Sequence, residues 1–124
     1  MNGNSVLLDT NIVLYLLSGD QSLSELLFGK KLYLSFVTQL EALGYLSITP
    51  DEQEAVRSFL KDCIIIDINE TIKEIVIRTK QAQRIKLPDS IILCTAKYLN
   101  IPLMTADDDF SKFADEDIIF YKTD

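Results

Sequence analysis

The stretch Ser5-Val6-Leu7-Leu8-Asp9-Thr10-Asn11 predicts a buried strand that passes directly into a helix. Its apolar run up to Asp9 suits a strand of a parallel sheet, and Thr10 or Asn11 can cap the helix that follows. The carboxyl ends of parallel strands gather along one edge of a sheet. Asp9, at the end of this strand, can therefore meet acids that lie far away in the sequence.

Strand and helix patterns alternate through the rest of the chain. Further strands are predicted at 32–36, 64–66, 102–105 and 118–121, with the isoleucine strand 64–66 buried. Helices are predicted at 23–28, from 38 onward, at 50–61, 71–84 and 88–100, and near Phe110. Helices placed between strands imply parallel pairing, with helices on both faces of the sheet. We therefore expect one α/β domain over 1–124, a three-layer α/β/α sandwich with a central five-stranded parallel sheet.

The composition fits a single domain that keeps some apolar surface for a partner. Hydrophobic residues make up 48% of the chain, and the mean hydropathy of +0.14 is high for a small monomer. No apolar run reaches the length of a membrane span, and the first residues lack the pattern of a signal peptide. We expect a cytoplasmic protein with no membrane segment.

The absence of histidine excludes several kinds of site. Histidine-dependent triads, histidine-based ribonuclease chemistry and histidine-ligated zinc all need a residue that this chain lacks. The four glycines form neither a phosphate-binding loop nor a dinucleotide fingerprint. Cys63 and Cys94 lie in apolar stretches without metal-ligand spacing, so we interpret them as buried free thiols. Carboxylates and a metal ion are the chemistry that remains.

Four short acidic segments occur where a strand or tight loop gives way to a helix. They are 7–11, 35–41, 87–90 and 105–110. Three of them end an apolar strand and the fourth opens a helix that precedes one, so all four can lie on the same rim of the sheet. Carboxylates gathered without a basic residue among them repel one another, and a hard divalent cation relieves that repulsion. The coincidence of the four segments predicts a metal site.

Each acid also has a purely structural interpretation. Asp9 can cap the next helix, and Asp89 stands in the first turn of a helix, where the macrodipole favours an acid. Thr38 and Glu41 have the spacing of a capping box. The run 107–109 can be a solvated, helix-capping loop. Singly, none of these acids is evidence of a site.

In order and content the four segments resemble the PIN domain, a family of metal-dependent ribonucleases, and in particular the small VapC-type toxins of bacterial toxin–antitoxin pairs. The resemblance spans nearly the whole chain. It is carried by Leu8-Asp9-Thr10-Asn11, by Ser35, Thr38 and Glu41, by Leu87-Pro88-Asp89-Ser90-Ile91-Ile92 with Ala96, and by Leu103-Met104-Thr105-Ala106-Asp107 with Asp109-Phe110.

The resemblance implies a set of site residues. The acidic quartet of the family falls on Asp9, Glu41, Asp89 and Asp107. Asp9, Asp89 and Asp107 are then the metal ligands, for one or two Mg²⁺ or Mn²⁺ ions, and Asp109 competes with Asp107 for the fourth position. The residues that match the polar supporting positions are Thr10, Asn11, Thr38 and Thr105.

The resemblance also implies an activity and partners. It implies an endoribonuclease that hydrolyses RNA phosphodiester bonds and leaves a 5′-phosphate, forms a homodimer and is silenced by a cognate antitoxin protein. Two alternatives stay open. One is a receiver-like phosphoacceptor signalling domain, for which Asp67 is the third-strand candidate. The other is a catalytically inactive PIN scaffold that binds protein.

A net charge of −7 is unfavourable for a protein that must approach RNA. The basic residues are unevenly spread, however, and the candidates for RNA contact are Lys73, Lys80, Arg84 and Lys86. They form either a phosphate-contacting strip beside Asp89 or a solvated outer face. The scattered aromatic residues, Tyr45 among them, are interpreted as core or interface packing in preference to base stacking.

Overall fold

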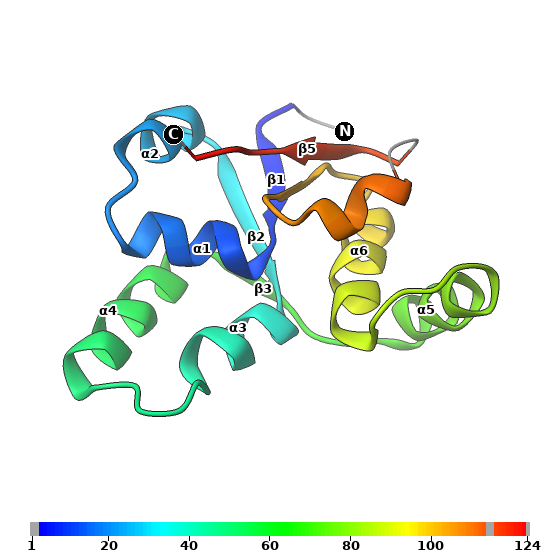
Figure 1. Ribbon diagram of the computed structural model, residues 1–124, viewed down its shortest axis with the longest axis horizontal. Helices are drawn as coiled ribbons and strands as arrows, with labels where there is room; N and C mark the ends of the chain where they lie inside the picture. The colour runs from blue at the N-terminus through cyan, green and yellow to red at the C-terminus, as the bar shows by residue number, and fades with distance from the viewer. Residues whose placement is uncertain (1–2, 114–115, 124) are drawn as a thin grey trace.

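The computed structural model describes residues 3–113 and 116–123, and its centre is a five-stranded parallel sheet (Figure 1). The strands are β1 (Ser5–Leu8), β2 (Lys31–Ser35), β3 (Ile64–Ile66), β4 (Leu103–Thr105) and β5 (Ile118–Phe120). The helices are α1 (Thr10–Leu17), α2 (Gln21–Leu27), α3 (Phe36–Leu43), α4 (Pro50–Lys61), α5 (Glu70–Ala82), α6 (Leu87–Leu99) and the 3-10 helix η1 (Asp108–Phe113). The predicted α/β/α sandwich is confirmed.

Alternating side chains of β1 divide the core between the two faces of the sheet. Val6 and Leu8 pack in a cluster with residues of α1, α2 and α4, whereas Leu7 packs with residues of α6 and η1. This is the period-two alternation of a strand buried on both faces. Helix α5 packs against α6 through a third cluster around Ile72, Val76 and Cys94. The two groups of helices lie on opposite sides of the sheet in Figure 1.

The strand order β3-β2-β1-β4-β5 places β1 at the point where the chain changes direction across the sheet. Strands β2 and β3 are added on one side of β1, and β4 and β5 on the other. Crevices form at the carboxyl ends of the strands at such a switch point. The receiver fold has the order 2-1-3-4-5 instead, so the receiver-like alternative is wrong for this chain.

Two helices begin earlier than the sequence predicted. Helix α1 is capped by Asp9, whose Oδ1 accepts a hydrogen bond from the Thr10 amide at 2.8 Å; this confirms the structural interpretation of Asp9 and excludes Thr10 and Asn11 as the cap. Helix α3 is capped by Ser35, whose Oγ accepts from the Val37 amide at 3.1 Å. Both strands lead into a helix without a loop. The cap of α1 is therefore the first residue after β1, and the cap of α3 is the last residue of β2.

Smaller features also differ from expectation or agree with it. Strand β3 is not buried, because it is the edge strand of the sheet and Ile64 is 39% exposed. Helix α4 has the predicted bounds and begins with a capping box, in which Thr49 and Glu52 are bonded reciprocally at 3.1 and 2.9 Å. Both cysteines are free, with Cys94 buried and Cys63 half-buried. Among the described residues no helix has the length and apolar character needed to cross a membrane.

Candidate metal and active site

Asp9 is the most buried acid of the site and is fixed through both of its carboxylate oxygens. Oδ1 accepts from the Thr10 amide at 2.8 Å and Oδ2 accepts from the Thr105 hydroxyl at 2.6 Å. The pKa of Asp9 is raised from 3.8 to about 6, mainly by burial and in addition by the charges of Asp89 and Asp107, against the effect of these hydrogen bonds. A neighbouring cation would offset the cost of ionising this group.

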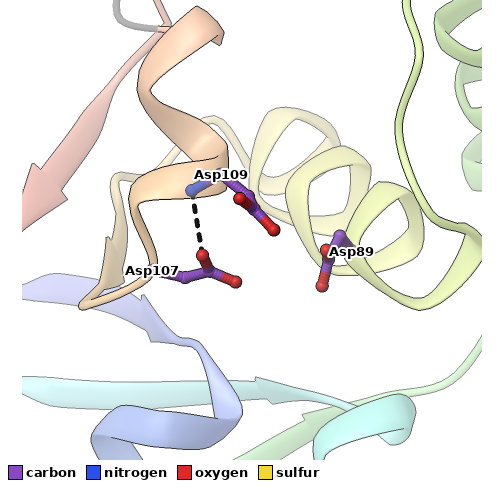
Figure 2. A group of neighbouring side chains, drawn as sticks. All are labelled: Asp89, Asp107 and Asp109. Atoms are coloured by element: carbon purple, nitrogen blue, oxygen red, sulfur yellow. Dashed lines mark hydrogen bonds between the residues drawn. The ribbon is translucent and has the colours of Figure 1, made fainter.

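Three further acids converge beside Asp9. Asp89 comes from the first turn of α6, Asp107 from the loop after β4 and Asp109 from η1. One carboxylate oxygen from each lies within 4.8 Å of the other two, and Figure 2 shows the three side chains pointing toward a common space. Burial raises the pKa of Asp89, and so does the charge of Asp107. The structure therefore brings together both residues that competed for the fourth position, Asp107 and Asp109.

The loop after β4 is held by a short chain of hydrogen bonds. The Thr105 hydroxyl, which donates to Asp9, accepts from the Asp107 amide at 3.0 Å. Asp107 Oδ1 in turn accepts from the Asp109 amide at 2.9 Å (Figure 2). Asn11 Oδ1 accepts from the Ala106 amide at 3.2 Å, which ties this loop to the first turn of α1. Thr105 and Asn11 thus orient the acids that the sequence placed beside them.

Glu41 faces the site from α3. Its Oε1 accepts from the Thr10 hydroxyl at 2.5 Å, and that hydroxyl lies 3.0 Å from the hydroxyl of Thr38. The capping-box interpretation of Thr38 and Glu41 is wrong, because Ser35 caps α3 and both residues lie within the helix. The charge of Glu41 also raises the pKa of Asp89. Glu41 is exposed and is held by its hydrogen bond from Thr10.

Two cavities flank the acids. The first, which we name the acidic cavity, has a volume of about 550 Å³. Its lining includes Asp9, Glu41, Asp89, Asp107, Leu14 and Tyr45. The second, the basic-rimmed cavity, has a volume of about 460 Å³. Its lining includes Arg84, Lys86, Lys112, Asp89, Asp109 and Phe110. Asp89 lines both cavities, so they meet at the carboxylates.

The four basic residues singled out in the sequence lie in different surroundings. Arg84 and Lys86 line the basic-rimmed cavity, and the charge of Lys86 lowers the pKa of Asp89. Lys80 Nζ donates to the Ile85 carbonyl at 2.8 Å, just behind that cavity. Lys73 forms an exposed ion pair with Glu70 at 3.0 Å.

Sequence reasoning missed three residues that line the cavities. Lys112 donates to the Arg84 carbonyl, which joins η1 to the loop before α6. Leu14 lines the acidic cavity from α1, and Tyr45 lines it from the segment after α3. Lys112 follows the acidic run 107–109 closely, and that proximity was the available signal. Tyr45 offered no signal of this kind.

The donor set fits a hard divalent cation. The acids of the site offer only carboxylate oxygens, which are the ligands that Mg²⁺ and Mn²⁺ prefer. Within residues 3–113 and 116–123, no lysine or arginine forms an ion pair with any of these acids. The repulsion among the carboxylates is therefore left for a bound cation to balance.

Comparisons with known proteins agree with this geometry. The profile of the PIN domain family matches residues 6–116. No match was found among curated proteins. A toxin–antitoxin complex from Klebsiella pneumoniae contains a chain with 28% identity and a TM-score of 0.83, and the match covers 95% of this chain and 99% of that one.

Two VapBC structures show the same likeness. VapBC-1 from nontypeable Haemophilus influenzae matches with 26% identity and a TM-score of 0.71, over 94% of this chain and 97% of that chain. VapBC2 from Rickettsia felis, bound to a DNA fragment from its promoter, matches with 19% identity and a TM-score of 0.79, over 97% and 99%. At that lower identity the likeness concerns the fold alone.

Proposed function

This chain belongs to the PIN domain family, and from that premise we propose that it is a VapC-type endoribonuclease, dependent on Mg²⁺ or Mn²⁺ and forming the toxin of a toxin–antitoxin pair. The observation that carries the proposal is the meeting of five acids, Asp9, Glu41, Asp89, Asp107 and Asp109, at the switch point of the sheet. We further propose that 1–124 forms one such domain.

Asp9, Asp89 and Asp107 are the proposed metal ligands, with Asp109 as a further ligand beside Asp107. Bound there, the metal would activate a water molecule and stabilise the leaving oxygen, which leaves a 5′-phosphate on the product. Glu41 is the proposed base, because its carboxylate lines the same cavity and, among the described residues, accepts a single hydrogen bond, from Thr10. Thr10, Asn11, Thr38 and Thr105 keep these carboxylates in position.

The proposed substrate is RNA whose phosphates contact Arg84 and Lys86. These two cations line the cavity that shares Asp89 with the acids, and in the part of the chain that the structure describes neither side chain forms an ion pair. Lys80 and Lys73 lie on α5 and would extend the contact with phosphates further along the RNA. The positive rim compensates locally for the net charge of −7.

The proposed partners are a cognate antitoxin and a second copy of this chain. Leu46 is 93% exposed, Leu40 61% and Ile77 48%, and such apolar side chains suit protein contacts. A cationic side chain of the antitoxin would be attracted by the uncompensated carboxylates and would compete with metal there. The toxin–antitoxin complex from Klebsiella pneumoniae supports this assignment by analogy.

The decisive experiment compares two aspartate-to-asparagine variants. Asp89→Asn should lose most of the rise in melting temperature that Mg²⁺ or Mn²⁺ causes in the wild type, because it removes a carboxylate of the cluster. It should also lower cleavage of a fluorescent RNA by at least about 100-fold. Glu41→Gln should lower cleavage while the metal response is retained.

Asp67→Asn is the matched control. Asp67 is exposed, its carboxylate accepts from the Ile68 amide, and it lines neither cavity, so the same chemical change there should leave cleavage and metal response as in the wild type. A chelator should abolish cleavage, and end-labelling should identify a 5′-phosphate. Wild-type protein that binds divalent metal but cleaves no RNA would instead indicate the inactive scaffold.

A further inference from the structure

The two cavities beside the acids differ in the chemistry they offer to a nucleotide. Cations line only the basic-rimmed cavity, where Arg84, Lys86 and Lys112 come together. The acidic cavity has no lysine or arginine in its described lining, and beyond the acids and their polar neighbours it offers Leu14 and Tyr45. Phosphate groups favour the first cavity, whereas an uncharged ring can occupy the apolar side of the second.

Leu14 and Tyr45 expose apolar surface to water in the acidic cavity, beside the carboxylates. Leu14 is 43% exposed on α1 and Tyr45 is 41% exposed just after α3. They line one continuous cavity with Asp9, Glu41 and Asp89. Anything that lies against them therefore lies next to the carboxylates.

Tyr45 is also held in place at both of its ends. Gly44 ends α3, and a Cβ there would lie 2.6 Å from the Leu40 carbonyl oxygen, so only glycine allows this turn without a shift. At the far end the hydroxyl neighbours Glu52: burial raises the pKa of Tyr45, and the charge of Glu52 raises it as well. The capping box fixes Glu52 in turn. A ring fixed in this way loses little freedom when it stacks on a ligand.

We propose that Leu14 and Tyr45 form a base-binding shelf that receives the base on one side of the cleaved bond, while the phosphate on the other side lies among Arg84, Lys86 and Lys112. The proposal rests on the ribonuclease function proposed above. Stacking requires a base that is not paired in a duplex, and a purine covers more of the ring than a pyrimidine. Tyr45 is then a specificity-determining residue, and the unlike flanks set the direction of the strand across the acids.

The charge of the two cavities favours a nucleobase over a side chain of a partner protein as the occupant. An RNA strand presents a neutral ring and an anionic phosphate at neighbouring positions, which matches a neutral shelf and a cationic rim on the two sides of Asp89. A cationic side chain of the antitoxin would match the acids, but it would leave Arg84 and Lys86 in the neighbouring cavity without an anionic partner.

The test uses a short RNA with one cleavage site, mapped with the wild type, in which an abasic residue replaces the nucleotide on either side of the cut. In the wild type, one of the two replacements should lower kcat/KM by about 10-fold or more, as stacking on an aromatic residue accounts for about 1–3 kcal/mol per base. Tyr45→Ala should lower kcat/KM on the intact RNA by a similar factor. In this variant the abasic residue that slowed the wild type should cause no further loss.

Three variants separate stacking from folding. Tyr45→Phe keeps the ring and should retain base preference, whereas Tyr45→Leu keeps apolar bulk without the ring and should lose it. Tyr98→Ala is the control, because Tyr98 is 42% exposed on α6 and is not among the residues that line either cavity. Melting temperatures with and without Mg²⁺ verify that each protein is folded and that its metal site is intact.

The outcomes distinguish this inference from the proposed function. If the wild type cleaves RNA and the abasic residue lowers kcat/KM equally in the wild type and in Tyr45→Ala, the base-binding shelf is wrong. The proposed ribonuclease function is unaffected by that result. Loss of antitoxin binding in Tyr45→Ala with unchanged cleavage would assign Leu14 and Tyr45 to the partner, which also overturns the shelf. Should the wild type cleave nothing, fluorescence of a 2-aminopurine base bound to the Glu41→Gln protein still decides, since stacking on Tyr45 must quench it.

Discussion

Asp9 combines burial with a charge that its surroundings only partly compensate. It is 5% exposed, accepts two hydrogen bonds and has Asp89 and Asp107 as neighbours. The hydrogen bonds favour the ionised form, but burial outweighs them and raises the pKa to about 6. At neutral pH the metal-free protein therefore keeps Asp9 ionised at a cost in folding free energy.

This cost predicts how stability depends on pH. The folded-state pKa of about 6 lies above the ordinary value of 3.8, so the folded protein binds the extra proton between these values. The stability contributed by protonated Asp9 is complete below about pH 4 and is lost as the pH rises through 6, by about 3 kcal/mol in total at about 1.4 kcal/mol per pKa unit. The raised pKa of Asp89 acts in the same direction.

Urea unfolding in chelator between pH 4 and 7.5 measures this effect. The fall in unfolding free energy should be smaller in Asp9→Asn than in the wild type, and Mg²⁺ should reduce it in the wild type by favouring the ionised carboxylate. Asp67→Asn should follow the wild-type profile. Parallel profiles for Asp9→Asn and the wild type would mean that Asp9 does not titrate in this range.

The elements that carry the site could largely be predicted from sequence, whereas their caps could not. Apolar runs and turn residues identified the strands and helices in the right order, since those signals are local. The bounds of α4, predicted at 50–61, were correct for the same reason. The cap Ser35 was missed, and the choice between Asp9 and Thr10 or Asn11 as the cap of α1 stayed open, because a strand that leads directly into a helix leaves no loop residues to mark the boundary.

The part of the site that sequence could not predict depends on contacts between distant segments. The path of the chain from β4 into η1 brings Asp109 next to Asp89 and Asp107. The turn at Gly44 brings Tyr45 to the cavity that the acids line. Neither has a repeating pattern in the sequence. The strand and helix pattern placed the four acidic segments on one rim of the sheet, and the resemblance to the PIN family then indicated one acid in each segment.

The contact between α1 and the loop after β4 leads to a prediction at this scale. Asn11→Ala removes the acceptor of the Ala106 amide, and we expect a loss of about 1 kcal/mol in stability. Because Asp107 and Asp109 follow directly, divalent metal should also bind several-fold more weakly, as measured by calorimetric titration with Mn²⁺.

Asn69→Ala is the matched control for this contact. Asn69 caps α5 by accepting from the Ile72 amide at 2.8 Å, so its loss should cost a similar amount of stability. Asn69 lies outside the acid site, and its variant should bind metal as the wild type does. Equal metal affinity in Asn11→Ala and Asn69→Ala would show that the link to α1 does not position the acids.

At the scale of the whole molecule, the question is how a chain with a net charge of −7 would hold the RNA that we propose as its substrate. The charge is not uniform, since the rim made by Arg84, Lys86 and Lys112 lies next to the acids that a metal would neutralise. RNA affinity should therefore depend on this local positive surface more than on the net charge of the protein. The decrease in affinity with salt should reflect the number of these cations that contact phosphate.

Binding measured against salt concentration tests this local surface. Arg84→Ala and Lys86→Ala should each weaken RNA binding and lower the slope of log affinity against log salt by about 0.7, the value for one phosphate contact on a single strand. Lys61→Ala makes the same change in net charge at an exposed position of α4, far along the chain from the rim, and should leave the slope unchanged.

If all three variants weakened binding equally, only net charge would matter, and the cationic rim would have no part in holding RNA. A reduced slope confined to Arg84→Ala and Lys86→Ala would mean that two side chains beside Asp89 overcome the repulsion of an acidic protein, because a phosphate bound there is close to the rim and screened by solvent from most of the other charges.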